Sequence, residues 1–543
     1  MRRTLFAIPL LFLLIFYFYP LVKITAYSLL QDGSLAPQRL LAGLGSIACK
    51  KTVFFTLWQA ALSTLLTLAL ALPGAWIFQR YNFFGKRFLL AVMSIPFVMP
   101  TVVCAAAFEA MLGNHGLINQ LAMAMLPLDK PPLSLDHSVA FFLLAHVFYN
   151  YSLVLRIVSS YWSGIDSRLS AAARMLGASP WRCFCTITLP LLLPAIAAAA
   201  LLVFIFSFTS FGIILILGGP AHATLEVEIY RQAVHLFNLP LAATLSLVQI
   251  IINMLLMWFH ARLGQNHPVS FFAEESIKGV APQTISAKLA VGTTTIFIAL
   301  LLIAPMASLF FASISGENGL TLNYYKALAT TNANSLFFVP PTAAIYNSLG
   351  FATAAMLLAL LLGLISAFFL AEDRKGTVAW DTLIMLPLAT SAVTLGFGYI
   401  LTLSTPPLNL RNSLALLPIA HALVALPFVM RITLPAIRQI PQQLRDAAIL
   451  LGASPTTVLR TVELPLIRNA VLIAAIFAFS ISMGEFGATS LLFRPQLPTL
   501  PMAIFRFLGT PGTLNYGQAM AMASLLMLVT GAGFFIIGSL EKK

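Results

Sequence analysis

Long apolar runs separated by short polar segments dominate this sequence. A helix needs about 20 mostly apolar residues to cross a membrane, and twelve runs are long enough. Six of them occupy the first half, near residues 4–22, 53–78, 88–112, 138–160, 190–216 and 239–261. Six more occupy the second half, near residues 289–313, 346–371, 379–404, 412–434, 467–492 and 514–540. The pattern predicts an all-α membrane protein with about 12 transmembrane helices.

The composition agrees with a lipid environment. Of the 543 residues, 59% are hydrophobic and 9% are Asp, Glu, Lys or Arg. A soluble protein carries about 25% charged residues, so this chain has too few to cover the surfaces of several soluble domains. Intrinsic disorder is excluded as well, because disordered chains are poor in apolar and aromatic residues.

The net charge of +14 is explained by membrane topology. If the amino terminus is cytoplasmic, 21 of the 31 basic residues fall on the cytoplasmic side, whereas the acidic residues divide 9 to 8. This bias is what the positive-inside rule describes. We therefore expect both termini in the cytoplasm and do not expect nucleic acid as a partner.

The two halves of the chain repeat one another. A shift of 275 positions aligns residues 169–191 with residues 444–466 at 12 identities in 23 positions, without a gap. Six spans per unit is an even number, so both units have the same orientation and form a parallel repeat. We expect a first transmembrane core over residues 1–262, a polar linker over 263–288 and a second core over 289–543.

The most informative segment lies between the fourth and fifth span of each half. In both copies an Ala-rich stretch favours helix, a glycine supplies the left-handed residue that ends it, and Ser-Pro resembles an N-cap followed by proline at the first helical position. Each copy therefore predicts two short helices joined by a sharp turn on the cytoplasmic side. The first copy contains Ala171, Ala172, Ala173, Gly177, Ser179, Pro180 and Pro190. The second contains Asp446, Ala447, Ala448, Gly452, Ser454, Pro455 and Pro465.

A pair of helices lying at the lipid interface is the structural alternative, but two copies at the same spacing argue for a docking surface. The repeated segment resembles the E-A-A-x3-G-x9-I-x-L-P signature of permease subunits of bacterial ABC importers, and the whole chain is similar to their fused, two-core members. The resemblance implies the type I importer architecture, with each segment acting as a coupling helix on an ATP-binding subunit. The acidic position is Asp446 in the second half but Ala171 in the first, a departure that bears on whether both contacts are equally strong.

The sequence contains no phosphate-binding loop of the form G-x4-G-K-[ST], no cluster of catalytic groups and no metal-binding spacing among its four cysteines. We therefore expect no enzymatic activity, no catalytic residues, no metal and no cofactor on this chain. The resemblance implies that a separate ATP-binding cassette subunit, present as a homodimer, binds ATP and Mg and drives alternating access. It also implies a periplasmic or lipid-anchored substrate-binding protein and a location in the bacterial inner membrane among its lipids.

Ionisable residues inside a span cost about 2.5–3.5 kcal/mol on insertion scales, which makes them candidates for a transport pathway. Glu485 is the best candidate, in the eleventh span, and Ser210 is its counterpart in the first half. His146 and His421 occupy equivalent positions in spans four and ten, where interhelical hydrogen bonding is favoured over substrate contact. Asn150 is a weaker pathway candidate.

Three segments, residues 55–60, 144–150 and 217–230, are similar to thiamine importer permeases. The last of these is expected to be an external loop that meets the binding protein. We therefore expect thiamine or its phosphates as substrate, with ferric iron, which related fused permeases carry, as the alternative. A secondary transporter of the major facilitator type also has six plus six spans, but its basic loop motif follows the second span, whereas here the repeated segment follows the fourth.

Overall fold

A computed structural model describes the chain except for residues 1, 32–33, 94, 97–98, 127, 265–278, 317–318, 331–338, 373–376, 405, 407 and 541–543. Most of the predicted linker therefore lies outside the described residues. Within them, ten helices are long and apolar enough to cross a membrane, and two bent helix pairs bring the number to as many as twelve. The expected all-α membrane fold is confirmed.

Helices of different lengths form the described part of the first half. They are α1 (Arg2–Leu13), α2 (Tyr19–Leu29), α3 (Pro37–Gly45), α4 (Ile47–Arg80), α5 (Lys86–Val92), α7 (Thr101–Leu112), α8 (Leu117–Met125), α9 (Val139–Ser163), α10 (Ser167–Met175), α11 (Pro180–Cys183), α12 (Leu189–Phe208), η3 (Ile214–Gly218), α13 (Leu225–Tyr230) and α14 (Leu239–Gly264). Single π-helical turns join several of them, namely η1 (Leu14–Phe18), η2 (Phe184–Thr188) and η4 (Arg231–His235).

The second half follows the same plan. Its helices are α15 (Ile285–Ile298), α16 (Ala304–Ile314), α17 (Asn323–Ala327), α18 (Thr342–Ala371), α19 (Thr377–Met385), α20 (Ala392–Thr402), α21 (Leu416–Arg438), α22 (Gln442–Leu450), α23 (Pro455–Val458), α24 (Leu464–Leu466), α25 (Arg468–Gly484), α26 (Gly487–Leu492), α27 (Leu500–Leu508) and α28 (Thr513–Leu540). The turns η5 (Ala299–Ile303), η6 (Leu386–Ala389) and η7 (Leu459–Glu463) connect them. Two antiparallel strand pairs, β1 (Leu30–Gln31) with β2 (Ser34–Leu35) and β3 (Ser315–Gly316) with β4 (Gly319–Leu320), close one loop in each half.

Each half is built around three mutually packed helices. In the first half α4, α9 and α12 pack together, and in the second α18, α21 and α25 do the same. Local sequence sets where several helices begin: Ser46 and Ser138 accept hydrogen bonds from the first turns of α4 and α9, which satisfies donors that a helix start leaves unpaired. The parallel repeat is therefore present in the packing as well as in the sequence.

Four predicted spans are not continuous helices. The third separates into α5 and α7, with Pro96 and Pro100 between them, and the ninth bends by 93° between η6 and α20. Proline lacks the N–H that would continue a helical ladder. The fifth and eleventh spans end early, at Phe208 and Gly484. The predicted spans near 88–112, 190–216, 379–404 and 467–492 therefore contain breaks, which the pattern of apolar residues did not reveal.

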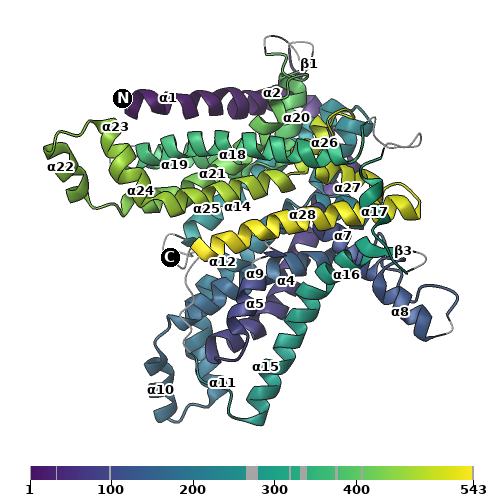
Figure 1. The fold of residues 1–543 in the computed structure, drawn as a ribbon, viewed down its shortest axis with the longest axis vertical. Helices are drawn as coiled ribbons and strands as arrows, with labels where there is room; N and C mark the ends of the chain where they lie inside the picture. Colours follow the sequence, from purple (N-terminus) through teal and green to yellow (C-terminus); the bar gives the residue numbers. More distant parts are fainter. Residues whose placement is uncertain are drawn as a thin grey trace.

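The first span of each half packs against the opposite half. Helix α1 lies along α18, and α2 packs on α20, while α16 packs on α7 (Figure 1). Side chains fix this crossing: the Tyr17 hydroxyl donates to the Leu386 carbonyl at 2.9 Å, and the Tyr399 hydroxyl donates to the Phe16 carbonyl at 2.9 Å. The two halves therefore interlock instead of forming two independent cores.

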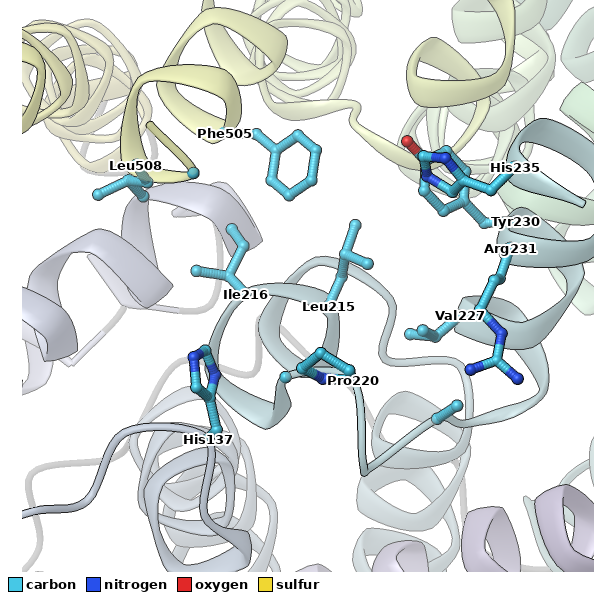
Figure 2. A pocket seen from close by; sticks show the side chains of 13 residues that line it. His137, Leu215, Ile216, Pro220, Val227, Tyr230, Arg231, His235, Phe505 and Leu508 are labelled. Atoms are coloured by element: carbon cyan, nitrogen blue, oxygen red, sulfur yellow. The ribbon is translucent and has the colours of Figure 1, made fainter. Parts of the chain in front are cut away.

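One end of the molecule carries the two predicted short helix pairs. In Figure 1, α10–α11 and α22–α23 project from the same end at widely separated points, and α1 begins and α28 finishes toward that end. The loops near β1, β3 and α8 lie toward the other end. A pocket of about 360 Å³ opens between the halves, lined by α27 residues such as Phe505 and by Leu215, Tyr230 and His137 of the first half (Figure 2).

Candidate functional site

The two short helix pairs have the same backbone geometry, as the sequence predicted. Gly177 and Gly452 adopt φ of +86° and +83°, a conformation that favours glycine. The amide of Ala178 donates to the carbonyl of Ala173, and that of Ala453 donates to Ala448, each at 3.0 Å. These bonds across five residues close the Schellman motif that ends a helix.

The following short helices begin as predicted too. The Ser179 and Ser454 hydroxyls each accept from a backbone amide three residues later, at 3.2 Å, and a proline follows each serine. Helix, turn and second helix are therefore fixed by local sequence in both copies. Pro190 and Pro465 are the second residues of α12 and α24, directly after the π-helical turns η2 and η7.

Each pair exposes two large apolar side chains at its tip. Met175 and Leu176 are 89% and 90% exposed, and the equivalent Leu450 and Leu451 are 87% and 89% exposed. Exposed apolar side chains grouped on a projecting segment are typical of a protein contact surface. We call these two segments, residues 167–183 and 442–458, the docking knobs.

The two knobs differ in their charged groups. Asp446 is exposed and accepts a hydrogen bond from Gln442 at 3.0 Å, whereas Ala171 offers no acceptor at the equivalent place. In the second half only, Arg445 Nε lies 2.9 Å from the fully buried Glu463 Oε1; residues 170 and 188 are Ser and Thr at the matching positions. This ion pair holds the second knob to η7, and the sequence analysis did not identify it.

The predicted histidines connect helices in both halves. His146 Nδ1 lies 2.8 Å from the hydroxyl of Ser63 on α4, and its Nε2 lies 2.8 Å from the hydroxyl of Ser210 in the break after α12. His421 Nδ1 lies 2.8 Å from the Ser482 hydroxyl, on α25. Asn150 donates to the His146 carbonyl one turn earlier on α9. His146 and Ser210 are thus brought together, as are His421 and Glu485.

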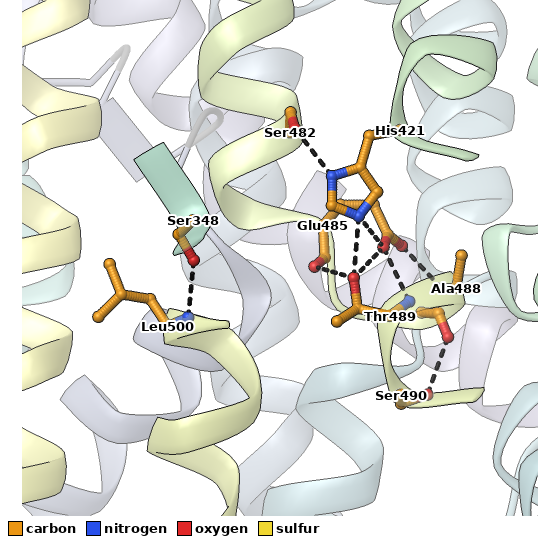
Figure 3. Close-up of polar contacts among 9 residues, drawn as sticks. Ser348, His421, Ser482, Glu485, Ala488, Thr489, Ser490 and Leu500 are labelled. Atoms are coloured by element: carbon orange, nitrogen blue, oxygen red, sulfur yellow. Dashed lines mark hydrogen bonds and ion pairs between the residues drawn. The ribbon is translucent and has the colours of Figure 1, made fainter. Parts of the chain in front are cut away.

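Glu485 stands at the break between α25 and α26. Its carboxylate accepts from the backbone amides of Ala488 and Thr489 at 2.9 and 3.0 Å, and from the Thr489 hydroxyl at 2.8 Å (Figure 3). His421 Nε2 lies 3.3 Å from the same carboxylate, which is 8% exposed. Amide donors at the start of a helix stabilise a carboxylate, so this geometry caps α26. A direct role in the transport pathway stays a prediction.

The expectation of an external loop over residues 217–230 was wrong for most of that segment. Only the turn at Pro220 and Ala221 is exposed, and α13 is buried along its whole length because it packs on α14 and α20. Within it, Glu226 accepts from Gln249 Nε2 at 2.9 Å, and Gln249 Oε1 accepts from the Thr394 hydroxyl at 3.0 Å. This buried chain of hydrogen bonds joins the two halves.

Sequence reasoning missed Glu226 because its segment was expected to be an external loop. The signal was a pair of acids, Glu226 and Glu228, among the apolar residues of the stretch from Leu225 to Tyr230. A buried carboxylate needs hydrogen-bonding partners, and those partners lie on α14 and α20, far away in the sequence. No spacing rule would have joined them.

Comparison with known proteins gives the family. Residues 66–266 and 359–543, well over half of the chain, match the family described as binding-protein-dependent transport system inner membrane component. The chain belongs to this family. It is a permease subunit of an ABC importer with several membrane-spanning helices in the inner membrane, and ATP hydrolysis takes place on a separate subunit. The family and the position of the docking knobs exclude the major facilitator alternative.

Several relatives extend over nearly the full length of this permease. It is 25% identical to the thiamine transport system permease protein ThiP of Brucella abortus over 482 residues, which cover 87% of this chain and 85% of that protein. It is 26% identical to ThiP of Escherichia coli, with coverage of 88% and 86%. The probable ABC transporter permease protein y4fN of Sinorhizobium fredii is 24% identical, with coverage of 90% and 88%.

Among solved structures, the permease is similar to a chain of a bacterial ABC transporter involved in the import of alginate. The TM-score is 0.40 at 16% identity, over 48% of this chain and 93% of that one. A second structure of the alginate transporter, bound to its periplasmic protein, also has a TM-score of 0.40 at 16% identity, over 47% and 91%.

Proposed function

We propose that this permease translocates thiamine or its phosphates, delivered by a periplasmic or lipid-anchored binding protein. The supporting observation is similarity to thiamine permeases over about seven-eighths of the chain. Two further observations agree with this proposal. The chain contains the paired docking knobs that an ATPase needs, and the described residues include no group of three His, Cys, Asp or Glu side chains placed to hold a metal ion.

The proposed mechanism is alternating access driven from the knobs. Two copies of one ATP-binding subunit bind ATP and Mg. One copy contacts the first knob through Met175 and Leu176, and the other contacts the second knob through Leu450 and Leu451. Closure of the ATPase pair draws the knobs together. The first knob leads into α12 through η2, and the second leads through η7 and α24 into α25 across a bend of 74° at Ile467. Movement of the knobs is transmitted along these helices toward the span breaks at Ser210 and Glu485. Both termini lie on the ATPase side in this scheme.

The substrate is tested in a strain lacking this gene. We expect uptake of labelled thiamine to fall at least tenfold and to return when the wild-type gene is restored, with growth under iron limitation unchanged. A growth defect under iron limitation with normal thiamine uptake would favour ferric iron instead. Normal behaviour in both assays would remove both substrates.

A further inference from the structure

Four aromatic rings from equivalent positions form one continuous row between the halves. Phe211 and Phe486, related by the shift of 275 residues, have ring centroids 5.3 Å apart and planes 28° apart. Phe211 also contacts Tyr230 at 5.5 Å, and Phe486 contacts Phe505 at 5.4 Å. Tyr230 and Phe505 are again related by 275 residues. We call these four side chains the aromatic row.

The aromatic row fills the boundary at which the two repeats meet. Phe211 and Phe486 are 5% and 3% exposed, and they directly follow Ser210 and Glu485 at the span breaks. An aromatic pair contributes about 0.5–1.5 kcal/mol beyond its buried area. The row therefore has the position and the strength expected of a barrier in the pathway.

The outer members of the row, Tyr230 and Phe505, line the pocket of about 360 Å³ between the halves (Figure 2). That volume falls in the range of about 300–1,000 Å³ that is usual for small-molecule sites. Aromatic and aliphatic side chains form most of its lining, including Leu215, Ile216 and Leu508. Its helix α27 lies away from the end that carries the docking knobs.

The polar groups of the pocket suit a ring-bearing solute better than a metal ion. Its lining includes His137, His235 and Arg231, and the described residues that form it include no carboxylate, whereas hard cations prefer oxygen ligands. The Arg231 guanidinium lies 2.9 Å from the Glu228 carboxylate. Its charge is thereby compensated, so it does not repel a cationic ring.

We infer that this pocket receives a flat aromatic solute before translocation and that the aromatic row is the barrier it must pass. The solute stacks on Tyr230 and Phe505, and its polar edges accept or donate hydrogen bonds at the two histidines. Separation of Phe211 from Phe486 then opens the way toward the span breaks. The inference rests on the proposed function, since it assigns thiamine to this place.

The test uses the complete transporter in proteoliposomes, with its ATPase and thiamine-loaded binding protein. Leu508→Trp fills the pocket, and Leu320→Trp, on the exposed strand β4 outside it, is the matched control. We expect Leu508→Trp to lower the initial rate of labelled thiamine uptake at least tenfold and Leu320→Trp to change it less than twofold. ATP hydrolysis stimulated by the binding protein reports that each variant is assembled.

A second pair of variants decides the question if Leu508→Trp does not assemble. Tyr230→Phe keeps the ring and should retain uptake within about twofold, whereas Tyr230→Ala should lose at least tenfold. If the wild-type transporter takes up thiamine and either Leu508→Trp or Tyr230→Ala takes it up at the same rate, the assignment of the pocket is wrong and the proposed substrate stands. Absence of thiamine uptake by the wild-type transporter would overturn the proposed substrate and, with it, the assignment of the pocket.

Discussion

At the scale of single residues, the buried acid Glu485 serves the backbone. Glu485 satisfies amide donors that the break between α25 and α26 would otherwise leave unpaired, and His421 holds it from a neighbouring helix. The equivalent position in the first half, Ser210, makes one hydrogen bond to His146. The two span breaks are thus stabilised differently. The break at Glu485 is held by several hydrogen bonds to its carboxylate, whereas the break at Ser210 is held by one side-chain hydrogen bond.

We expect Glu485→Ala to lower the stability of the permease by about 3 kcal/mol, because it leaves two buried amides unpaired. Glu485→Gln should cost about 1 kcal/mol, since an amide oxygen still accepts from Ala488. Ser210→Ala, which removes one bond, should cost about 1 kcal/mol. Thermal unfolding of the purified protein in detergent measures the order of the three variants. Equal melting temperatures for Glu485→Ala and wild type would contradict the capping role, and a stable Glu485→Gln without uptake would place the acid in the pathway.

At the scale of elements, the docking knobs are self-contained units whose form follows from local sequence. Helix stop, left-handed glycine, serine cap and proline lie within about a dozen residues, so the sequence predicted them correctly. The span breaks, the packing of each first span on the opposite half, and the burial of α13 were not predictable in this way. Each depends on contacts between distant segments, such as Tyr17 with Leu386 or Glu226 with Gln249.

The exposed knob tips should bind the ATPase. We expect Leu451→Asp to reduce recovery of the ATP-binding subunit with the purified permease at least tenfold, because a charge would be buried in an apolar contact. Leu176→Asp tests the first knob in the same way. Leu320→Asp, at the other end of the molecule, should leave recovery unchanged. Full recovery with both knob variants would show that the knobs are not the contact surface.

The ion pair between Arg445 and Glu463 should hold the second knob in place. Arg445→Met breaks the ion pair of the fully buried Glu463 carboxylate, and breaking a buried ion pair costs about 3–5 kcal/mol. We expect faster hydrogen exchange over residues 442–463 in this variant. The double variant Arg445→Met with Glu463→Met should recover most of the protection, because an apolar pair replaces a buried ion pair at little cost. Unchanged exchange in Arg445→Met would mean that the pair does not order the knob.

At the scale of the whole molecule, two repeats share one boundary. The repeat, the number of spans and the family could be predicted from sequence, because Gly, Pro and Arg keep their register over the shift of 275 residues. The boundary itself could not. The aromatic row joins residues that are neighbours only after folding. So do the hydrogen bonds that connect Glu226 through Gln249 to Thr394. The predicted topology places most basic residues on the expected ATPase side, which would account for the +14 net charge.

The most direct test of this account is thiamine accumulation in proteoliposomes that contain the permease, its ATPase and a loaded binding protein. We predict accumulation that requires all three proteins together with ATP and Mg, and that persists when a protonophore collapses the proton gradient. Accumulation without ATP, lost when the protonophore is added, would contradict the central claim that nucleotide-driven movement of the two knobs powers this permease.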